Sequence, residues 1–557
     1  MTDRLMIALA QINPTVGDLT GNVSRIKDRY LEAVAQGADL VLFSEMVVSG
    51  YPPEDLVLKP FFLDKVEAAV QSLVELTAGR DTGMIVGAPW RVDGKRHNAA
   101  LLIVDGEISA VRCKHELPNY GVFDEKRVFE PGALLGPVDF KGVRIGIPIC
   151  EDMWFPDVTE CLEECGAEML LVPNGSPFEV DKSDQRMQNA VARVTESGLP
   201  LAYVNQVGGQ DELVFDGGSF VLNGDCSMAV QMPACEEAME LTTWERGKKG
   251  WACQPGAKVA PPERLENMYR VVVLGLRDYV NKNGFPGIIL GMSGGIDSAL
   301  SAAVAVDALG ADRVHCVMMP SPYTSRESLE DASSACALLG VSLDEVGIKP
   351  AMDAFQQMFA PLFGDRAADV TEENIQARSR GLTLMALSNK MGYMVLTTGN
   401  KSEMSVGYAT LYGDMCGGYS VLKDIYKTDV FRLCHWRNEG KPAPWKDIML
   451  GPDGPVMPER IISKPPSAEL RPDQKDEDSL PPYDVLDDIL YCLVEGEKSV
   501  EEIVARGHDP QMVQRVWRML DLAEYKRRQA PPGVKITSRA FGRDRRYPIT
   551  NAFRKIL

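Results

Sequence analysis

The chain has 557 residues, of which 45% are hydrophobic and 25% charged, and its formal net charge is −20. Because this length exceeds what one hydrophobic core usually supports, we expect two large domains. The excess of acidic residues argues against a nucleic-acid partner, since phosphate backbones are bound mainly by clustered Lys and Arg. The sequence has neither a signal-peptide pattern nor an apolar run of membrane-spanning length, so we expect a cytoplasmic protein with no membrane partner.

The N-terminal part alternates short apolar runs with helical stretches up to about Val230. Helices are expected at 22–36 and 184–197, between some of the runs. The strand-length runs are 6–10, 40–43, 84–87, 100–104, 143–147, 169–172 and 201–204. This alternation predicts a layered α/β domain, which we place at residues 1–250.

Residues 251–262 are rich in Pro and Gly and carry no apolar period, which predicts a linker. The remaining residues, 263–557, again alternate helices with strands, in an order that predicts an open, mainly parallel α/β sheet domain with a loop for binding pyrophosphate. Its expected elements are helices at 263–283, 328–339 and 373–391 and strands at 288–290, 314–318 and 393–396. The Pro- and Asp-rich segment 443–482 is expected to be a loop or a disordered insert.

The twelve cysteines lack regular spacing, which in a chain of this length is typical of reduced thiols rather than of a disulfide framework. Cys161 and Cys165 form one close pair. No second pair or histidine lies nearby in the sequence to complete a zinc site, so we interpret this pair as structural.

Three residues with complementary chemistry stand at the ends of apolar runs: Glu45, Lys114 and Cys150. Each alone has an ordinary structural explanation, and a single cysteine among twelve is usually structural. Together they form a chemical set, because a thiolate can attack a carbonyl, a carboxylate can accept the thiol proton and an ammonium can stabilise the oxyanion. The set predicts an acyl-transfer site without histidine.

The sequence around these residues resembles the nitrilase superfamily, through the strings Phe43-Ser44-Glu45-Met46, Cys113-Lys114-His115-Glu116-Leu117-Pro118 and Ile149-Cys150-Glu151-Asp152-Met153-Trp154. The resemblance implies an αββα sandwich that hydrolyses non-peptide C–N bonds. It also implies that Glu45 is the base, Lys114 the oxyanion stabiliser and Cys150 the nucleophile.

Further strings at 118–125, 174–177 and 205–218 are similar to the glutamine-amidase branch of that superfamily. In that branch, Tyr120, Ser176 and Lys182 would bind the backbone groups of glutamine. For any single residue of 205–218, a polar turn between strands is an equally good explanation.

In the C-terminal half, a glycine-rich loop joins an apolar strand to a helix of small residues. Such a loop binds anions, because the backbone N–H groups and the positive end of the helix dipole face the ligand. It lacks the Walker A lysine, so the hydroxyls of Ser293 and Ser298 would help to hold phosphate, and Asp297 is placed to bind magnesium. The alternative is a strand-to-helix turn without a ligand. The loop reads Gly291-Met292-Ser293-Gly294-Gly295-Ile296-Asp297-Ser298.

The loop resembles the pyrophosphate loop of the ATP pyrophosphatase family, and the strings at 373–378 and 397–403 extend the resemblance to NAD synthetases. It implies that the loop, Thr398 and Lys427 bind ATP, and that Asn374, Glu403 and Lys526 bind deamido-NAD. Asp297 and Glu403 would hold Mg²⁺. From the residues alone, Asn374 could equally be a capping or surface residue. The chain departs from ammonia-only members at Tyr525, where histidine is usual, and in the loop 414–418.

A glutamine amidase joined to an ATP-dependent adenylating domain resembles the glutamine-dependent NAD synthetases. This implies a C–N ligase that takes ammonia from glutamine, uses ATP as co-substrate to adenylate deamido-NAD, and releases AMP and pyrophosphate. A homo-oligomer is also expected. Two alternatives are another ATP-pyrophosphatase amidotransferase, such as one acting on xanthosine monophosphate, and an amide hydrolase with a nucleotide-sensing domain. No G-x-G-x-x-G fingerprint occurs, so NAD would be a product and not a redox cofactor.

Overall fold

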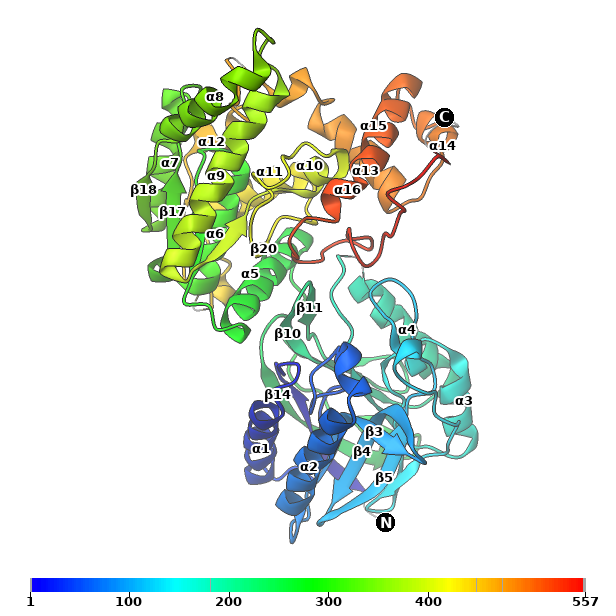
Figure 1. Cartoon of the computed structure of the whole chain (residues 1–557). Helices are drawn as coiled ribbons and strands as arrows, with labels where there is room; N and C mark the ends of the chain where they lie inside the picture. Colours follow the sequence, from blue (N-terminus) through cyan, green and yellow to red (C-terminus); the bar gives the residue numbers. More distant parts are fainter. Residues whose placement is uncertain (1–2, 181, 447, 473, 554–557) are drawn as a thin grey trace. The chain divides into compact units, whose positions relative to one another are not determined.

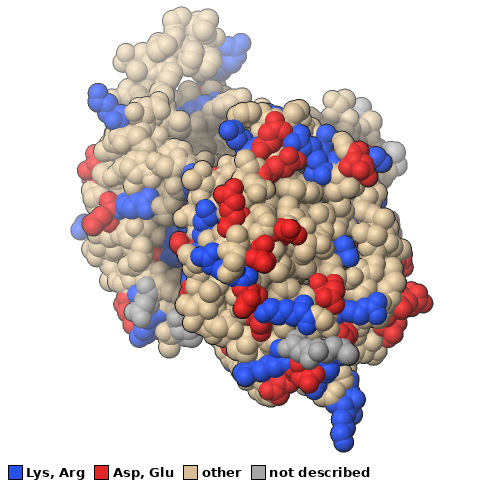
Figure 2. All heavy atoms as spheres, turned by 90° about the horizontal axis from the view of Figure 1, so that it is seen from below, with Lys and Arg blue, Asp and Glu red and all other residues tan. Residues whose placement is uncertain are grey.

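The computed structural model describes residues 3–553 except 181, 447 and 473, and it divides into two compact units (Figure 1). Unit 1 is Met1–Pro262 and unit 2 is Glu263–Leu557. Within the described residues, none of the helices is long and apolar enough to cross a membrane. On the face drawn in Figure 2, acidic and basic side chains lie interspersed.

Unit 1 contains two β-sheets packed face to face, with helices outside each. The seven-stranded sheet has the order β15-β14-β1-β2-β3-β4-β5. Its strands are β1 (Arg4–Gln11), β2 (Leu40–Leu42), β3 (Gly83–Val92), β4 (Lys95–Val104), β5 (Glu107–Cys113), β14 (Ala238–Gly247) and β15 (Gly250–Cys253). The six-stranded sheet has the order β13-β12-β9-β8-β7-β6. Its strands are β6 (Val138–Phe140), β7 (Val143–Gly146), β8 (Met169–Asn174), β9 (Leu201–Asn205), β12 (Phe220–Leu222) and β13 (Met228–Gln231).

Helices complete the four layers, α1 and α2 on the larger sheet and α3 and α4 on the smaller. They are α1 (Leu19–Ala35), α2 (Pro60–Thr77), α3 (Pro156–Glu164) and α4 (Lys182–Ser197), and a two-stranded hairpin, β10 (Val207–Gln210) and β11 (Leu213–Asp216), lies apart from both sheets. The αββα sandwich implied by the sequence resemblance is therefore confirmed.

The sequence of β1 shows why it can lie between two layers. Its larger residues, Ile7 and Leu9, pack into the core between the sheets, whereas Ala8 and Ala10 pack against the helices. Since side chains alternate across a strand, this pattern separates large from small residues by face. Ala8 and Ala10 share a core with α1 and α2, and both faces of the strand are buried.

The segment expected to be the linker begins with a strand. Gly250–Cys253 forms β15, which pairs antiparallel with β14 at the edge of the larger sheet. Trp251 and Cys253 are 4% and 3% exposed, so both belong to the core of unit 1. The connection without regular structure therefore starts only after Cys253, and the Pro-Gly composition concealed a four-residue edge strand.

Unit 2 is built on a five-stranded, all-parallel sheet of order β18-β17-β16-β19-β20. The strands are β16 (Ile288–Gly291), β17 (Val314–Met318), β18 (Ser342–Glu345), β19 (Met394–Thr397) and β20 (Tyr419–Ser420). The helices around it are α5 (Arg264–Lys282), α6 (Ile296–Leu309), α7 (Arg326–Leu339), α8 (Lys349–Phe363), α9 (Val370–Met391), α10 (Lys401–Val406) and α11 (Lys427–Asn438). The predicted open parallel sheet is confirmed.

A smaller helical cluster follows in the C-terminal part of unit 2, drawn orange to red in Figure 1. It contains α13 (Tyr483–Val494), α14 (Val500–Val504), α15 (Pro510–Leu522) and α16 (Glu524–Arg527), and the first three of these helices share one apolar core. The preceding helix α12 (Glu459–Ser463) packs instead against α6 and α11. Short 3₁₀ helices occur in both units at Glu54–Leu58, Glu125–Arg127, Cys150–Met153, Ala311–Arg313, Ala443–Trp445 and Asp476–Asp478.

The segment 443–482, expected to be a loop or disordered, is a packed part of unit 2. It has little regular structure, as expected, but Trp445 is fully buried and Arg460 forms an ion pair of 2.7 Å with Asp331 of α7. The carbonyl of Leu470 accepts a 2.8 Å hydrogen bond from Gln376 of α9. Buried apolar side chains such as Trp445 and Ile461, together with this ion pair and hydrogen bond, hold the segment against the rest of unit 2.

Candidate active sites

The structure brings Glu45, Lys114 and Cys150 of unit 1 together in a buried cluster. The Lys114 Nζ lies 2.8 Å from Glu45 Oε1 and 2.8 Å from Glu125 Oε1. Cys150 is 5% exposed and interacts electrostatically with both Glu45 and Lys114. The second oxygen of Glu45 accepts the backbone N–H of Gly175 at 2.8 Å. A base, a cation and a thiol therefore share one site in a low-dielectric environment.

Cys150 stands at a sharp turn between a strand end and a short helix. Its φ is +47°, in the left-handed region that side-chain-bearing residues rarely adopt. The Asp152 carboxylate fixes the turn by accepting the backbone N–H groups of Ile149 at 2.9 Å, His115 at 3.0 Å and Glu116 at 2.8 Å. One carboxylate thus joins the turn bearing the nucleophile to the strand end bearing Lys114.

The electrostatics of the cluster follow from burial and pairing. Burial raises the pKa of the Cys150 thiol well above its usual value, and the Glu45 charge raises it further, while Lys114 opposes the shift. Burial alone would lower the pKa of Lys114, but the Glu125 and Glu45 carboxylates hold it well above its usual value. The lysine is therefore a fixed cation, and the resting thiol keeps its proton until a base removes it.

Glu125 and Asn98 complete this cluster, although sequence reasoning assigned neither a role. Asn98 Nδ2 donates to Glu45 Oε1 at 2.6 Å, and Tyr51 Oη donates to Glu125 Oε1 at 2.7 Å. Glu125 is the last residue of the string 118–125, which resembles the glutamine-amidase branch. Its pairing with Lys114 depends on the tertiary fold, which the pattern does not show.

The three residues expected to bind glutamine have different surroundings. Tyr120 is 53% exposed and its hydroxyl donates to Glu151 Oε1 at 2.8 Å, next to the nucleophile in the chain. Ser176 Oγ accepts a 3.0 Å hydrogen bond from Arg186, which is buried and paired with Asp216. The Lys182 ammonium lies 5.2 Å from the ring centre of Phe123, the neighbour of Tyr120 in an edge-to-face pair. Tyr120 and Lys182 are thus joined through Phe123, and Arg186 was missed from the sequence.

In unit 2 the glycine-rich loop lies between β16 and the N-terminus of α6, as predicted. The Ser293 and Ser298 hydroxyls are 3.0 Å apart, and Gly295 N–H donates to Ser293 Oγ at 3.2 Å. Gly294 has φ +80°, and a Cβ there would lie 2.2 Å from the carbonyl oxygen of Ser328. Glycine is therefore required by both backbone conformation and space, and the loop's N–H groups remain at a helix N-terminus suited to an anion.

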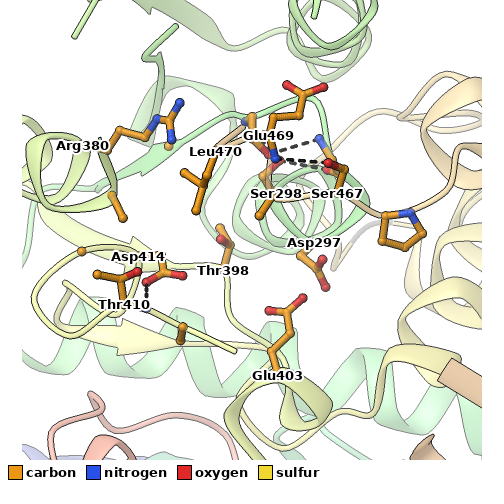
Figure 3. Close-up of a pocket in the computed structure, with 18 of the residues that line it drawn as sticks. Asp297, Ser298, Arg380, Thr398, Glu403, Thr410, Asp414, Ser467, Glu469 and Leu470 are labelled. Carbon is orange, nitrogen blue, oxygen red and sulfur yellow. Dashed lines mark hydrogen bonds between the residues drawn. The ribbon is translucent and has the colours of Figure 1, made fainter. Parts of the chain in front are cut away.

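Asp297 and Glu403 point toward each other across the pocket (Figure 3). The Lys427 ammonium forms ion pairs with both, at 3.2 Å from Glu403 Oε1, and Asn400 Nδ2 donates to Asp297 Oδ1 at 2.9 Å. Burial raises the pKa of Glu403 to about 8, with Lys427 opposing the shift and Asp297 adding to it. Asp476, buried and hydrogen-bonded to Tyr483, adds a further carboxylate nearby. The cluster has more carboxylates than cations.

This donor set fits a divalent cation that arrives with phosphate oxygens. Among the described residues, no group of three or more His, Cys, Asp or Glu side chains is arranged to hold a metal ion by itself. Mg²⁺ usually takes one or two carboxylates and completes its shell with waters and substrate phosphates. The Asp297 and Glu403 pair meets that requirement, and a cation would offset both the burial of Glu403 and its repulsion by Asp297, two of the effects that raise the pKa of Glu403.

These groups line one cavity of about 500 Å³. All the residues expected to bind ATP or deamido-NAD lie on its wall, namely Gly291–Ser298, Asn374, Thr398, Glu403, Lys427 and Lys526. Asn374 Oδ1 accepts a 3.0 Å hydrogen bond from Thr410 Oγ1, and Lys526 Nζ donates to the Gly407 carbonyl at 2.7 Å and the Ala409 carbonyl at 2.6 Å.

Three further charged residues line the same cavity, although they lie far in the sequence from the glycine-rich loop. Arg380 Nε donates to the Met319 carbonyl at 3.1 Å, and burial lowers the pKa of its guanidinium. Arg380, Asp414 and Glu469 reach the pocket from different elements (Figure 3). The sequence analysis assigned a role to none of these three residues.

Comparison with known proteins assigns both units to families. The model of the NAD synthase family matches residues 268–530, and that of the carbon-nitrogen hydrolase family matches 6–245. The glutamine-dependent NAD(+) synthetase of Rhodobacter capsulatus is 52% identical over 555 residues and that of Acinetobacter baylyi 46% over 552, with 98–100% of each chain covered. A solved structure of the Acinetobacter baumannii enzyme in complex with ADP is 44% identical, with a TM-score of 0.78 over 99% of both chains.

Proposed function

This chain belongs to the glutamine-dependent NAD(+) synthetases, and from this premise we propose how its two units divide the reaction. The enzyme is a C–N ligase that hydrolyses glutamine to ammonia and uses ATP to adenylate deamido-NAD, which ammonia converts to NAD with release of AMP and pyrophosphate. In our proposal, residues 1–250 together with the following strand form the glutaminase and residues 263–557 the synthetase. The observation that carries this division is that the buried thiol cluster and the phosphate-loop cavity lie in different units.

In the glutaminase, Cys150 attacks the side-chain carbonyl of glutamine while Glu45 accepts the thiol proton. The raised pKa of Cys150 makes this transfer necessary, because the resting group is a thiol and only the thiolate is a good nucleophile. The Lys114 ammonium stabilises the oxyanion that develops, and its pairing with Glu125 keeps it charged and in place. Glu45 then returns the proton to the leaving ammonia, and water hydrolyses the thioester.

Substrate glutamine is bound by Tyr120, Ser176 and Lys182. The Lys182 ammonium suits the α-carboxylate, and the Ser176 hydroxyl, oriented by Arg186, can donate to the same group. Tyr120 is held by Glu151, and Glu151 itself can accept from a substrate ammonium. These assignments use residues from separate elements, which is what fixes the orientation of a small polar substrate.

In the synthetase, the loop Gly291–Ser298 holds the phosphates of ATP through its N–H groups and the Ser293 and Ser298 hydroxyls, together with Thr398 and Lys427. Asn374, Glu403 and Lys526 bind deamido-NAD. Asp297 and Glu403 would hold Mg²⁺, which when bound supplies charge stabilisation for the phosphates. Lys427 lies between the two carboxylates, so it can turn toward the phosphates when a cation takes over its role.

Ammonia must pass from one unit to the other as the neutral molecule, since ammonium has no lone pair for attack. We therefore infer a water-excluding route between the sites, with glutaminase activity linked to occupancy of the synthetase pocket. We also propose that the enzyme is cytoplasmic, because its substrates glutamine, ATP and deamido-NAD are small polar molecules.

A homo-oligomer is supported by the exposed apolar surface of α8 and α9. Every residue of α8 is at least partly exposed, and Phe355, Phe359 and Phe363 stack along it at 6.1 and 5.3 Å. On the same helix pair, Met358 is 64%, Leu362 71% and Leu382 65% exposed. Exposed apolar surface of this kind is typical of interaction sites in proteins, and in our proposal a second copy of this chain covers it.

The test of the proposed function is incubation of the purified enzyme with ATP, deamido-NAD and glutamine, with NAD, AMP and pyrophosphate assayed together. Equal amounts of the three products are expected, with ammonium able to replace glutamine. Formation of ADP and phosphate instead of AMP and pyrophosphate would contradict the adenylation step. Hydrolysis of glutamine without any NAD would leave the nucleotide-sensing hydrolase as the better explanation.

A further inference from the structure

One wall of the nucleotide pocket is a segment without regular structure that returns to the phosphate loop from far along the chain. Residues Lys464–Leu470 follow α12 and line the cavity. At one end, the Leu470 carbonyl is bound by Gln376 of α9 at 2.8 Å. At the other, Lys464 Nζ donates to Ser328 Oγ at 2.7 Å in the first turn of α7. The wall is therefore pinned at two points.

The strongest of these attachments is made by Glu469. Its Oε1 accepts from Ser325 Oγ at 2.8 Å and from Ser328 Oγ at 2.7 Å, and its Oε2 accepts the Ser325 backbone N–H at 3.3 Å. The Lys464 ammonium lies 3.5 Å from Glu469 Oε1. Hydrogen bonds to an ionised group are stronger than neutral ones, and the N-terminus of α7 favours an anion.

The backbone of Glu469 supports the same conclusion. Its φ is +47°, a conformation that residues with a side chain adopt only when surrounding contacts hold it. The contacts that hold it are those of the carboxylate with α7, together with the Glu469 N–H, which donates to Ser467 Oγ at 3.1 Å. The strained backbone of Glu469 is therefore maintained by the contacts that its carboxylate makes with α7.

The first turn of α7 also touches the phosphate loop. The carbonyl oxygen of Ser328 is so near Gly294 that a Cβ on the glycine would lie 2.2 Å from it. The same serine binds Glu469 through its hydroxyl. A single residue thus connects the loop expected to bind phosphates with the segment that walls the pocket.

We propose that Glu469 is a positioning residue for ATP, which latches the segment 464–470 to α7 and so keeps the pocket wall beside the phosphate loop. This inference rests on the proposed function, because it assigns ATP to that pocket. Without the latch, binding of ATP must order the segment at the expense of affinity, whereas the bound complex is unchanged. Glu469 does not touch the reacting atoms, so turnover at saturating ATP should persist.

The experiment measures steady-state NAD synthesis with ammonium as nitrogen donor. Glu469→Ala should raise the KM for ATP about tenfold and leave kcat within twofold. Glu469→Gln, which still accepts from both serine hydroxyls but lacks the charge, should raise it only about threefold. This variant also keeps the side-chain volume, so it decides the question should the alanine variant fail to fold. The control Glu477→Ala, at an exposed position in the same part of the chain, should not change the KM.

A double-mutant cycle with Ser328→Ala locates the effect. If the contact between Glu469 and Ser328 carries it, the double variant should have a KM for ATP no higher than the worse single variant. Additive effects, an unchanged KM in Glu469→Ala, or a fall in kcat without a rise in KM would overturn the latch. Wild-type enzyme that forms no AMP from ATP, deamido-NAD and ammonium would overturn the proposed function instead.

Discussion

Each unit contains a buried lysine between two carboxylates, and the two clusters differ in what surrounds them. In unit 1, Lys114 and Glu45 have fully buried side chains, and both oxygens of Glu45 have partners within the protein. In unit 2, the side chains of Asp297 and Glu403 are 18% and 19% exposed and face a cavity of about 500 Å³.

The difference shows that access, not composition, decides what an acid–ammonium cluster can do. A closed cluster beside a thiol has its charges already arranged, so it can stabilise charge that develops on a small substrate. An open one with surplus carboxylates needs further cations, so it suits a ligand that brings metal and phosphate together. The predictions below alter one cluster at a time.

The largest effect is expected in unit 1, where Cys150→Ala removes the nucleophile. Glutamine-supported NAD formation should fall at least about a thousandfold, while synthesis from added ammonium should be spared. Product assays with each nitrogen source measure the two activities separately, and Cys165→Ala, at an exposed thiol, is the control. Loss of both activities in a folded Cys150→Ala enzyme would show that the two sites are not separable.

The corresponding change in unit 2 is Asp297→Asn or Glu403→Gln. Each should reduce synthesis from either nitrogen source by about a hundredfold or more, because one charged ligand for the cation is lost. Hydrolysis of glutamine, measured as glutamate formed, should remain possible. Asp312→Asn, an exposed position beyond α6, should behave as wild type. Normal ammonium-supported turnover in either variant would remove that residue from the metal site.

The pKa of about 8 for Glu403 predicts a proton linkage in unit 2. Below pH 8 the free carboxyl holds a proton, and a bound cation favours the charged form, so binding of ATP with Mg²⁺ should release a proton. Apparent affinity should then fall by up to about tenfold for each pH unit below 8. Calorimetry at pH 7 in two buffers of different ionisation enthalpy measures the release. It should vanish at pH 9 and in Glu403→Gln, and no release at pH 7 would contradict the linkage.

The smallest effect concerns communication between the clusters. Glutaminase activity should rise severalfold when ATP and deamido-NAD are both present, because occupancy of one site is linked to turnover at the other. In the same reaction, glutamine labelled with ¹⁵N in its amide should label NAD despite excess unlabelled ammonium. Mass spectrometry of the product measures the labelled fraction. Full dilution of the label by bulk ammonium would exclude a sealed route.

The sequence predicted those parts of both sites that lie in short strings at strand ends. The cluster of Glu45, Lys114 and Cys150 and the whole phosphate loop were located this way, and helix 328–339 was expected where Arg326–Leu339 forms. Each string contains residue types with a recognisable chemical role, and the carboxyl ends of parallel strands lie at the same edge of a sheet.

Other residues could not be found this way, because their partners are remote in the sequence. Glu469 binds serines more than 140 positions earlier, and Arg186 pairs with Asp216 of a different element. The composition of 443–482 predicted a loop or a disordered insert; the segment has little regular structure, but it is held by contacts with α7 and α9 that no local pattern records. Strand β15 was hidden for another reason: four residues are too few to display a period.

Strand β15 also determines whether unit 1 can fold stably without unit 2. A chain cut at Gly250 would lose Trp251, whose ring packs at 5.0 Å against the Arg246 guanidinium, and would leave β14 as an unprotected edge. Removing a buried tryptophan costs roughly 3–5 kcal/mol, a large share of a domain's stability. A bare edge strand invites pairing with other molecules. The residues of β15 therefore protect the edge of the larger sheet, and a glutaminase domain expressed alone must retain them to stay monomeric and folded.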